Sequence, residues 1–434
     1  MAAIKVTIIG AGSRFAFSVV SDLMRVEAFA GSTVALVDTN ANALDLSVRV
    51  INQMVKKAGG DLVIEQSTDR REVLGGSDFV LNSISVGEPW AREKDVAIGE
   101  QHGIFQPTSQ TVGPAGFMRG VRVVPHVVAI AHDIADLCPN ATILDLANPL
   151  AAVCRSMIRE ANLNVIGLCE QWAVTLPNFS ELLGTDDLDC LSVGTNHLTF
   201  ALGLFHNGQD VLPEFLKKIN SEEGKSLRER LPVSYEIYDA FGLWPTGTEE
   251  HIAEFFPYFL TPETDGGMAY NLRTRHTTEE VVAERRAERE AWASGEKPID
   301  HLLEPSGESA VDIIASLLGV IDAEMHMVNV PNNGLIDNLP DEAIVELPAH
   351  IGPGGVRGLK VGALPRGIAQ FLDTRVAQQE VLIDAALSGD PNLALQGLLL
   401  DTQVTSLTAA REILTASLSA NADWLPNFKT DNHK

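Results

Sequence analysis

Polar residues that can do chemistry stand at the ends of several apolar, β-branched runs. Asn148 follows one such run, Cys169 ends the next, and the segment GTNH places Asn196 and His197 at the end of a later one. A thiolate and a neutral imidazole are both good ligands for Mn, Zn or Ni, so Cys169 and His197 could share a divalent cation. The ordinary alternative is that the cysteine is a small core residue and the histidine a hydrogen-bonding group.

A glycine-rich turn near the N-terminus indicates a dinucleotide site. The apolar run IKVTII leads into Gly10 and Gly12, and a helical pattern follows. In such a unit the first glycine permits a tight turn, and the second lets backbone amides approach a pyrophosphate at the start of a helix. Phe15 stands in place of the third glycine of the fingerprint, so the helix is expected to lie farther from the sheet. We expect the cofactor contacts to include Gly10, Gly12, Ser13, Arg14 and Phe15.

Asp38 ends the second apolar run, VALVD, about 26 residues after the glycines. This is the place of the carboxylate that binds the ribose 2′-hydroxyl in dinucleotide-binding units. A 2′-phosphate would be repelled there, so the sequence favours NAD over NADP. The alternative is that Asp38 only caps a helix that begins after Asn40.

The elements that must position these residues alternate between strands and helices in the first half. Strands are expected at 4–9, 33–38, 62–66, 79–83, 142–146 and 165–169. This alternation is typical of a Rossmann-like, doubly wound parallel sheet, an α/β fold. Asn207-Gly208 predicts a hairpin, where antiparallel structure begins. Helices are expected after that, including 277–296, 307–318, 364–386 and 392–418.

The length of the chain favours two domains with a binding cleft between them. With 434 residues it exceeds the size at which single cores stop growing. We expect a dinucleotide-binding domain over 1–195 and a mainly helical α+β lobe over 196–434 for the substrate and for oligomerisation, interwoven with the first because no linker separates them.

The balance of charge excludes some classes of partner. The 32 basic and 58 acidic residues give a net charge of -26, which repels nucleic acid and anionic membranes. The four cysteines show no disulfide pattern, and no membrane span or signal sequence is apparent. We therefore expect a cytoplasmic protein with a small-molecule substrate, most simply a homodimer or homotetramer.

The motifs together resemble glycoside hydrolase family 4 and its sister family of NAD-dependent sulfoquinovosidases. The resemblance covers nearly the whole chain, through GAGS, VDTN, DFVLNSISVG, GPAGFMRGVR, CPNATILDLANPLA, VIGLCE, GTNHLTF, HIAEFFPYF, VNVPNNGLIDNLP and VGALPRGIAQ in the family's order. It implies a fold like that of lactate and malate dehydrogenases. It also implies hydrolysis by transient oxidation at C3 with NAD, elimination at C1, addition of water and return of the hydride.

The resemblance also implies roles for individual residues. Cys169 and His197 would bind the metal, such as Mn, and Asn148 and Asn196 would contact the substrate. Family members usually have histidine after the ligand cysteine, whereas this chain has Glu170, which could be a third ligand or mark a site that dispenses with metal.

The base that removes the C2 proton is left open by the sequence. Some members use a tyrosine, which points to Tyr238 or Tyr235 in LPVSYEIY. Others use a residue near TEEHIAEFF, where Glu250 and His251 lie. The alternatives are that Tyr238 packs in the core and that Glu250 is a solvated acid at a helix N-terminus.

The resemblance further implies an anionic group at C6 of the sugar. Arg92 matches a family position that contacts this group, and Arg119 and Arg285 could join it. The alternative for Arg92 is an ion pair with Asp95. Of the anionic sugars we place α-sulfoquinovosides first, with α-galacturonides, α-glucuronides and 6-phosphoglycosides as alternatives. Competing functions are a 2-hydroxyacid dehydrogenase with net NAD turnover and a non-catalytic NAD-binding regulator.

Overall fold

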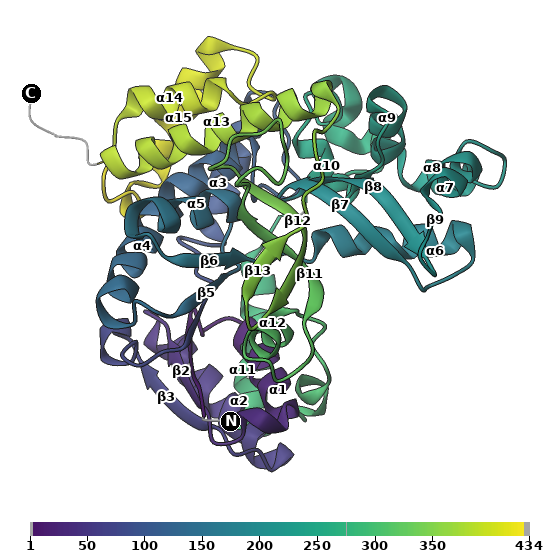
Figure 1. Ribbon diagram of the computed structural model, residues 1–434. Helices are drawn as coiled ribbons and strands as arrows, with labels where there is room; N and C mark the ends of the chain where they lie inside the picture. The colour runs from purple at the N-terminus through teal and green to yellow at the C-terminus, as the bar shows by residue number, and fades with distance from the viewer. Residues whose placement is uncertain (1–2, 275, 429–434) are drawn as a thin grey trace, which may run out of the picture.

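The computed structural model describes residues 3–274 and 276–428, and within them one mixed sheet runs through the molecule (Figure 1). Its 13 strands follow the order β10-β8-β7-β12-β11-β6-β5-β4-β1-β2-β3, with β13 beside β12 and β9 beside β8. The strands are β1 Lys5–Ile9, β2 Thr33–Val37, β3 Val63–Ser67, β4 Phe79–Asn82, β5 Thr142–Asp145, β6 Asn164–Gly167, β7 Asp189–Thr195, β8 Leu198–His206, β9 Gln209–Asp210, β10 Pro245–Thr246, β11 Glu324–Pro331, β12 Ile344–Gly352 and β13 Gly355–Gly358.

The helices cover both faces of the sheet and its two ends. They are α1 Phe15–Arg25, α2 Ala41–Ala58, α3 Trp90–Gln101, α4 Gly113–Leu137, α5 Leu150–Ala161, α6 Leu176–Leu183, α7 Leu212–Ile219, α8 Lys225–Arg230, α9 Pro232–Phe241, α10 Glu249–Glu254, α11 Glu279–Ser294, α12 Ala310–Leu317, α13 Arg366–Ser388, α14 Pro391–Leu399 and α15 Leu407–Ala420. Short 3₁₀ turns occupy several connections.

The six strands from β1 to β6 form the parallel half of the sheet. Each pairs in parallel with its neighbours in the order β6-β5-β4-β1-β2-β3, and all six expected strands are confirmed to within two residues. Apolar side chains from α1, α2 and α12 pack on one face, and those from α4 and α5 on the other. Burial on both faces explains why β1, β2, β4, β5 and β6 are largely apolar, whereas β3, at the edge of the sheet, contains Glu65 and Gln66. The predicted doubly wound sheet is therefore present.

The remaining strands are antiparallel, and two of them were not expected. The predicted hairpin is confirmed, with Asn207 and Gly208 at positive φ between β8 and β9. The strands β11 and β12 return from the second half of the chain and insert between β6 and β7. The sequence did not indicate these two strands, because each contains a proline and a polar residue that break the apolar run. The described region after Leu212 is otherwise mainly helical, as expected.

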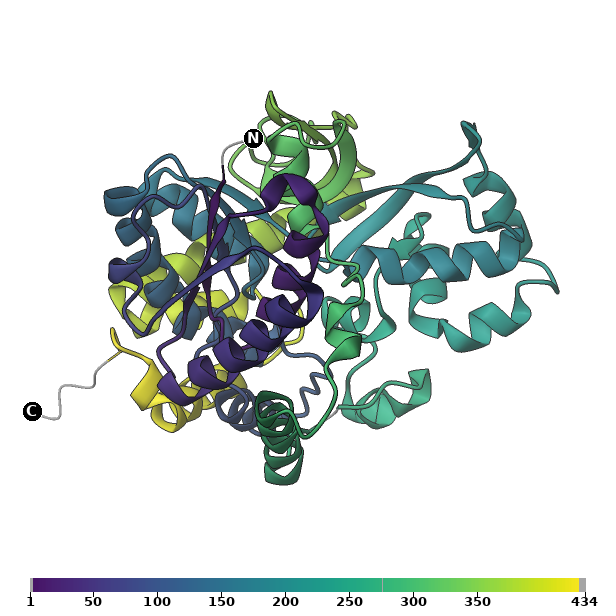
Figure 2. The same cartoon turned by 90° about the horizontal axis from the view of Figure 1, so that it is seen from below.

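Two helical groups complete the molecule. The strands β7 and β8 with α6 to α9 form an arm that projects from the body in both views (Figures 1 and 2). The helices α13, α14 and α15 pack together, and α13 lies on α4 and α5. The predicted helix over 392–418 is interrupted between α14 and α15. The expected domain boundary at 195/196 falls in the turn between β7 and β8, and the division into domains stays a prediction.

None of the helices within residues 3–274 and 276–428 is long and apolar enough to cross a membrane.

Buried charges tie the C-terminal helices to the start of α4. Asp401 is 2% exposed and accepts hydrogen bonds from the Gly113 amide at 2.8 Å, from Gln378 Nε2 at 3.1 Å and from Arg375 Nη1 at 3.2 Å. The first amides of a helix have no partner within the helix. Asp401 therefore satisfies one of these amides and the buried guanidinium at once.

We predict that Asp401→Ala lowers the free energy of unfolding by about 3–5 kcal/mol, because it leaves the Arg375 cation buried without its counter-ion. Denaturant unfolding followed by circular dichroism measures this. As a control, Glu181→Ala removes the exposed partner of Arg230 and should cost less than about 1 kcal/mol. Equal effects of the two substitutions would show that the buried pair does not hold α4.

Candidate active site

A cavity of about 640 Å³ lies at the carboxyl ends of the parallel strands. Its walls come from elements far apart in the sequence: the start of α2, the segment between β4 and α3, the loop before α4, α4 itself and α11. Polar and charged side chains line it, including those of Asn40, Ser85, Glu88, Gln110 and Arg119. In doubly wound sheets this edge is where ligands bind.

The glycine turn at one end of the cavity is built for close approach. The Gly12 amide donates to Asp38 Oδ2 at 2.8 Å, and a Cβ on Gly12 would lie 2.6 Å from the same oxygen. The Asn40 amide donates to Asp38 Oδ1 at 2.8 Å, while Asn40 itself caps α2 through the Ala43 amide. Asp38 thus holds the turn, and Asn40 performs the capping that the alternative assigned to Asp38.

The residues present fit a dinucleotide at this turn. Gly10 adopts φ 92°, which an L side chain rarely allows. The hydroxyl of Ser13 is buried and has no hydrogen-bond partner, and no side chain caps the start of α1 after Arg14. Free amides at a helix N-terminus attract the phosphate oxygens of a nucleotide. The expected contacts Gly10, Gly12, Ser13, Arg14 and Phe15 all lie in this turn or in the first residue of α1.

A second group of polar side chains meets around the turn between β7 and β8. His197 adopts φ 69° there and is 4% exposed. Its Nδ1 lies 2.7 Å from Thr111 Oγ1, and its ring centroid lies 4.2 Å from that of His251. Asn196 Nδ2 donates to Glu346 Oε2 at 2.9 Å.

Asn148 precedes α5 and carries a buried side-chain oxygen without a partner. The Asn148 carbonyl oxygen accepts from Arg119 Nε at 3.2 Å, and the Arg119 charge acts on His197. Asn148 thereby connects the second group to the arginine that lines the cavity. Its orphaned oxygen is available to a ligand hydroxyl.

Burial dominates the electrostatics of the second group. It lowers the pKa of His197 well below its usual range, and the neighbouring His251 and Arg119 lower it further. Burial also lowers the pKa of His251 to about 4. Both imidazoles are therefore neutral at pH 7. Burial raises the pKa of Glu346 to about 7, and burial with the charge of Glu346 raises the pKa of the Cys169 thiol to about 12.

The described residues near His197 do not form a metal site of three protein ligands. Within residues 3–274 and 276–428, no three His, Cys, Asp or Glu side chains come close enough together to hold one. Glu170 Oε1 instead accepts from the Ser309 hydroxyl at 2.9 Å, and the Nδ1 of His197 is engaged by Thr111. The Arg119 cation beside His197 also opposes a second positive charge. The assignment of Cys169 and His197 as metal ligands stays a prediction.

The candidate bases lie in different places. Tyr238 packs against Trp244 with ring centroids 5.8 Å apart, and its hydroxyl accepts from Asn220 at 3.0 Å. It belongs, with Tyr235, to the apolar cluster of the projecting arm and does not meet His197. Glu250 is the second residue of α10 and is half-buried, whereas His251 faces His197. Only His251 of these candidates is brought to the second group.

Arg92 and Arg119 line the same cavity but differ in their partners. Arg92 Nη1 pairs with Glu93 Oε1 at 2.6 Å, and Nη2 donates to the Pro107 carbonyl at 2.9 Å. The expected alternative pairing with Asp95 is wrong, because Asp95 is buried against Arg122. Arg119 Nη1 lies 3.6 Å from Glu88, at the long end of an ion pair. Arg119 is thus less tightly held than Arg92.

Two residues of the site escaped the sequence prediction. Thr111 lies in the segment TVGPAG, which was noted for its polarity, but nothing in that motif indicated a contact with His197. Glu346 lies in the run AIVELPAHI, where a carboxylate within an apolar strand was the available signal. Burial of Glu346 at 1% exposure confirms that this signal was informative.

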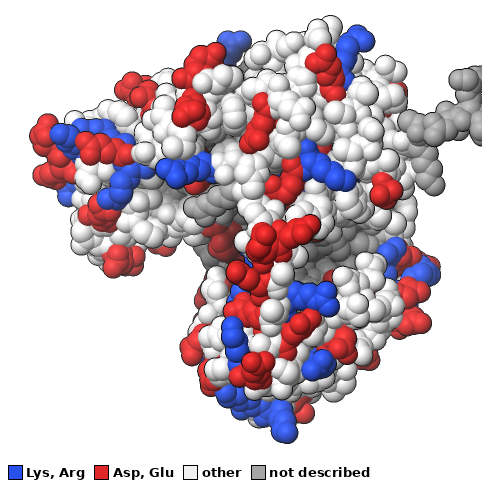
Figure 3. Space-filling model, turned by 180° about the vertical axis from the view of Figure 1, so that it is seen from behind, with Lys and Arg blue, Asp and Glu red and all other residues white. Residues whose placement is uncertain are grey.

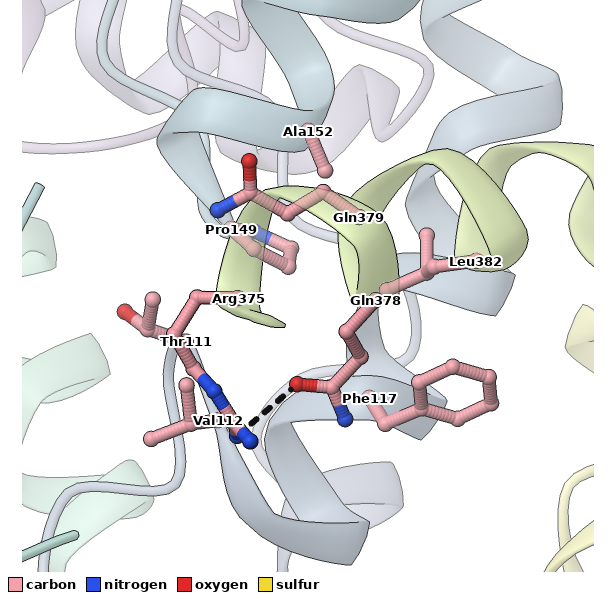
Figure 4. Close-up of a pocket in the computed structure, with 9 residues that line it drawn as sticks. All are labelled: Thr111, Val112, Phe117, Pro149, Ala152, Arg375, Gln378, Gln379 and Leu382. Atoms are coloured by element: carbon pink, nitrogen blue, oxygen red, sulfur yellow. Dashed lines mark hydrogen bonds between the residues drawn. The ribbon is translucent and has the colours of Figure 1, made fainter. Parts of the chain in front are cut away.

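Packing behind the loop holds Thr111 in place. Figure 4 shows a small hollow in which Thr111 and Val112 lie near Arg375 and Gln378 of α13, with Phe117 of α4 at its side. Arg375 Nη1 donates to Gln378 Oε1 at 3.0 Å. The orientation of the Thr111 hydroxyl therefore depends on α13, which lies more than 250 residues later in the chain.

The sequence matches two patterns of one family. Residues 5–185 match the family 4 glycosyl hydrolases, and residues 192–404 match the C-terminal domain of the same family. Together the matches cover most of the chain. The protein belongs to the family 4 glycosyl hydrolases.

Relatives of known name carry different sugar specificities. The chain is 31% identical to an α-galacturonidase of Bacillus subtilis, over 92% of this chain and 93% of the relative. It is 28% identical to an α-galactosidase of the same organism, over 98% of this chain and all of the relative. The family membership predicted from the motifs is confirmed, and the relatives do not agree on one sugar.

Solved structures confirm the fold class. A Bacillus subtilis protein assigned as a glucosidase superimposes with a TM-score of 0.84 at 28% identity, over 96% of this chain and all of that one. A 6-phospho-α-glucosidase from gut microorganisms, solved with NAD and Mn²⁺, has a TM-score of 0.81 at 23% identity over 99% and 100% of the two chains. Malate dehydrogenase of Cryptosporidium parvum matches with a TM-score of 0.52 at 15% identity, over 89% and 100%. The likeness to malate dehydrogenases was expected.

We predict that Thr111→Val lowers kcat/KM for glycoside hydrolysis about tenfold, because the His197 ring loses the hydrogen bond that orients it. Thr111→Ser keeps the hydroxyl and should restore most of the activity. Initial rates of the two variants, with far-UV circular dichroism as a check on folding, measure this. A serine variant as slow as the valine variant would assign Thr111 to packing alone.

Proposed function

We propose that the protein hydrolyses a glycoside through transient oxidation at C3, with NAD as a cofactor that is regenerated in each turnover. The observation that carries this is one cavity whose lining arginines reach two chemically different groups, since Arg289 donates to the carbonyl oxygen of Gly12 and Arg119 donates to that of Asn148. The glycine turn with Asp38 fits a dinucleotide, and Asn148, Arg119 and His197 offer polar contacts to a sugar. A glycosidase that used two carboxylates would need neither the turn nor the neutral histidines.

In this chemistry NAD would accept the hydride from C3 of the sugar, which makes the proton on C2 acidic. A base then removes that proton, and the group at C1 leaves. Arg119 and the unpartnered oxygen of Asn148 would hold and orient the sugar hydroxyls. The Arg119 cation would also stabilise negative charge that develops on the oxygens of C2 and C3.

We assign the base to His251. Its Nδ1 lies 2.7 Å from the Thr248 hydroxyl, and its Nε2 lies 3.5 Å from Gln110 Oε1, a residue that lines the cavity. In the tautomer in which Nδ1 donates its proton to Thr248, Nε2 carries the lone pair that a base needs, and it then makes no hydrogen bond with the Gln110 oxygen, which can only accept. The contact with His197 keeps the ring at this wall of the cavity. Glu250, which shares α10, is the next candidate.

We predict that hydrolysis in deuterated water with NAD yields a product labelled at C2, while no NADH accumulates at 340 nm. His251→Ala should lower the rate of label incorporation by roughly 100-fold or more, the scale of a lost general base. Mass spectrometry of the released sugar and absorbance of the same reaction measure both quantities.

Tyr238→Phe is the matched control, since it removes the hydroxyl of the competing candidate and should leave the incorporation of label unchanged. A product without label would exclude the elimination pathway. Stoichiometric NADH with a 2-hydroxyacid would instead support the dehydrogenase, and loss of labelling in Tyr238→Phe alone would transfer the role of base to that residue.

The substrate that we propose carries an anionic group at C6. A chain of net charge -26 repels an anion at long range, so a local concentration of arginines has to be explained. Arg92 of α3 and Arg119 of α4 line the cavity from two separate elements. Because arginine binds oxyanions in two places and stays charged, this set suits an anionic sugar better than a neutral one.

A carboxylate is the first candidate for the anion, and a sulfonate is the second. The similarity to an α-galacturonidase favours a uronide, so the earlier preference for an α-sulfoquinovoside takes second place. The sulfonate stays a candidate because Ser85 and Gln110 also line the cavity and could donate to a third oxygen. An assay with aryl α-galacturonide, α-glucuronide, α-sulfoquinovoside and 6-phosphoglucoside distinguishes these possibilities.

We predict that Arg92→Ala and Arg119→Ala each lower kcat/KM for the preferred anionic glycoside by roughly 30-fold or more, because a desolvated charge pair loses one partner. The neutral 6-hydroxy analogue should be hydrolysed at nearly the wild-type rate by Arg92→Ala, whereas Arg119→Ala should slow it as well, because Arg119 also holds the sugar hydroxyls. Steady-state kinetics on both substrates measure this difference. A wild type that prefers the neutral glycoside would end the anionic assignment, and an equal effect of Arg92→Ala on both substrates would make Arg92 a residue that positions the loop.

A further inference from the structure

The helix α11 forms a wall of the cavity that no part of the proposed function uses. It contributes Arg285, Arg286 and Arg289 to the lining, opposite Asn40 and Asn42 at the start of α2. Arg289 is half-buried, and its guanidinium donates to the carbonyl oxygen of Gly12. The helix therefore contacts the glycine turn directly, although about 270 residues separate the two in sequence.

The C-terminal end of α11 is anchored on α2. Gln53 Nε2 donates to the carbonyl oxygens of Trp292 at 3.1 Å and Ala293 at 3.0 Å, and Arg49 Nη2 donates to the latter at 3.1 Å. The last carbonyls of a helix have no partner within the helix. The two α2 side chains satisfy them and hold the end of α11 against the dinucleotide-binding half.

The N-terminal end is anchored on α3 by a single carboxylate. Glu93 accepts from the Thr277 amide at 2.9 Å, and its other oxygen lies 2.9 Å from His276 Nδ1. The same carboxylate pairs with Arg92. Because both ends are held, α11 forms a strap along one wall of the cavity, and it lies beside α2 (Figure 1). We call it the α11 strap.

The charges on the inner side of the α11 strap are not fully balanced. Burial lowers the pKa of Arg289, and the positive charges of Arg14 and Arg285 lower it further. Arg14 itself lies over the Trp292 ring at 5.0 Å and 3.8 Å from Glu288. On the face shown in Figure 3, acidic and basic side chains are interspersed, as is usual for a protein surface. The guanidinium groups of Arg14, Arg285 and Arg289 instead come together near the glycine turn. This concentration of positive charge indicates a site for an anion.

We propose that the α11 strap binds the diphosphate of the dinucleotide, with Arg289 and Arg285 closing over phosphates that rest on the glycine turn. The proposal rests on the proposed use of NAD. The contact at Gly12 favours the diphosphate over a ribose 2′-phosphate, because the second glycine of such a turn is where the pyrophosphate approaches the backbone. The cofactor is then held from two sides: by the amides at the start of α1 and by cations from the second half of the chain.

The experiment measures binding by isothermal titration calorimetry, without any turnover. The ligands are NAD⁺, ADP-ribose, NADP⁺ and adenosine, and the proteins are the wild type, Arg289→Met, Arg285→Met and Arg289→Lys. Methionine keeps the apolar stem without the charge. Arg230→Met is the matched control, since it removes an exposed arginine from the projecting arm.

We expect Arg289→Met to weaken the binding of NAD⁺ and ADP-ribose about tenfold or more, the scale of a hydrogen bond to a charged group. Arg285→Met should act in the same direction, and Arg289→Lys should recover part of the loss. Adenosine, which has no phosphate, should bind all proteins equally. The dependence of log Kd on log salt should be shallower in the methionine variants. Arg230→Met should match the wild type.

The results test the use of NAD and the role of the α11 strap separately. A wild type that binds neither NAD⁺ nor ADP-ribose would refute the proposed function. Wild-type affinity of Arg289→Met and Arg285→Met for both ligands would refute the α11 strap as a phosphate site while leaving NAD use intact. A loss confined to NADP⁺ would overturn it in favour of a 2′-phosphate site. An equal loss of affinity for adenosine would also overturn the phosphate site, because it would assign the arginines a structural role. Thermal unfolding of each variant confirms that the comparison is between folded proteins.

Discussion

The site depends on a joint between the two halves of the sheet. At this joint Asn329 of β11 pairs with Gly167 of β6, and Glu346 of β12 pairs with Gly194 of β7. A Cβ on Gly167 would lie 2.8 Å from that of Asn329, so the two strands meet only because a glycine stands there. Without this joint, the turn that carries His197 would not come to the edge where the parallel strands end.

A second constraint concerns the charged groups of the interior, which need partners because they are removed from water. In a chain of net charge -26, the cations of the cavity are kept in place by carboxylates that serve several partners at once. Glu93 joins Arg92 to the α11 strap, and Asp401 joins α13 to the start of α4. Each carboxylate satisfies backbone amides as well as a guanidinium, which is what makes such a group tolerable in the interior. The loops around the cavity are therefore coupled to distant helices.

The parallel half of the fold was predictable, and the antiparallel half was less so. Strands buried on both faces are continuous apolar runs, and this pattern is local. The strands β11 and β12 escaped because polar residues such as Asn329 and Glu346 interrupt their apolar character, and these residues are polar because they lie at the site. Among the candidate bases, Tyr238 and His251 could not be ranked from the sequence, since the choice depends on whether α9 or α10 faces the cavity.

The sequence by itself determined the family, the glycine turn with Asp38, and the polar residues that end the parallel strands. These features depend on contacts between near neighbours, or on motifs whose order along the chain is itself the information. Only the tertiary structure decided that Thr111 contacts His197 and that Arg289 reaches the glycine turn. Those relations join residues separated by as many as 277 positions, and their geometry follows from packing that no local pattern records.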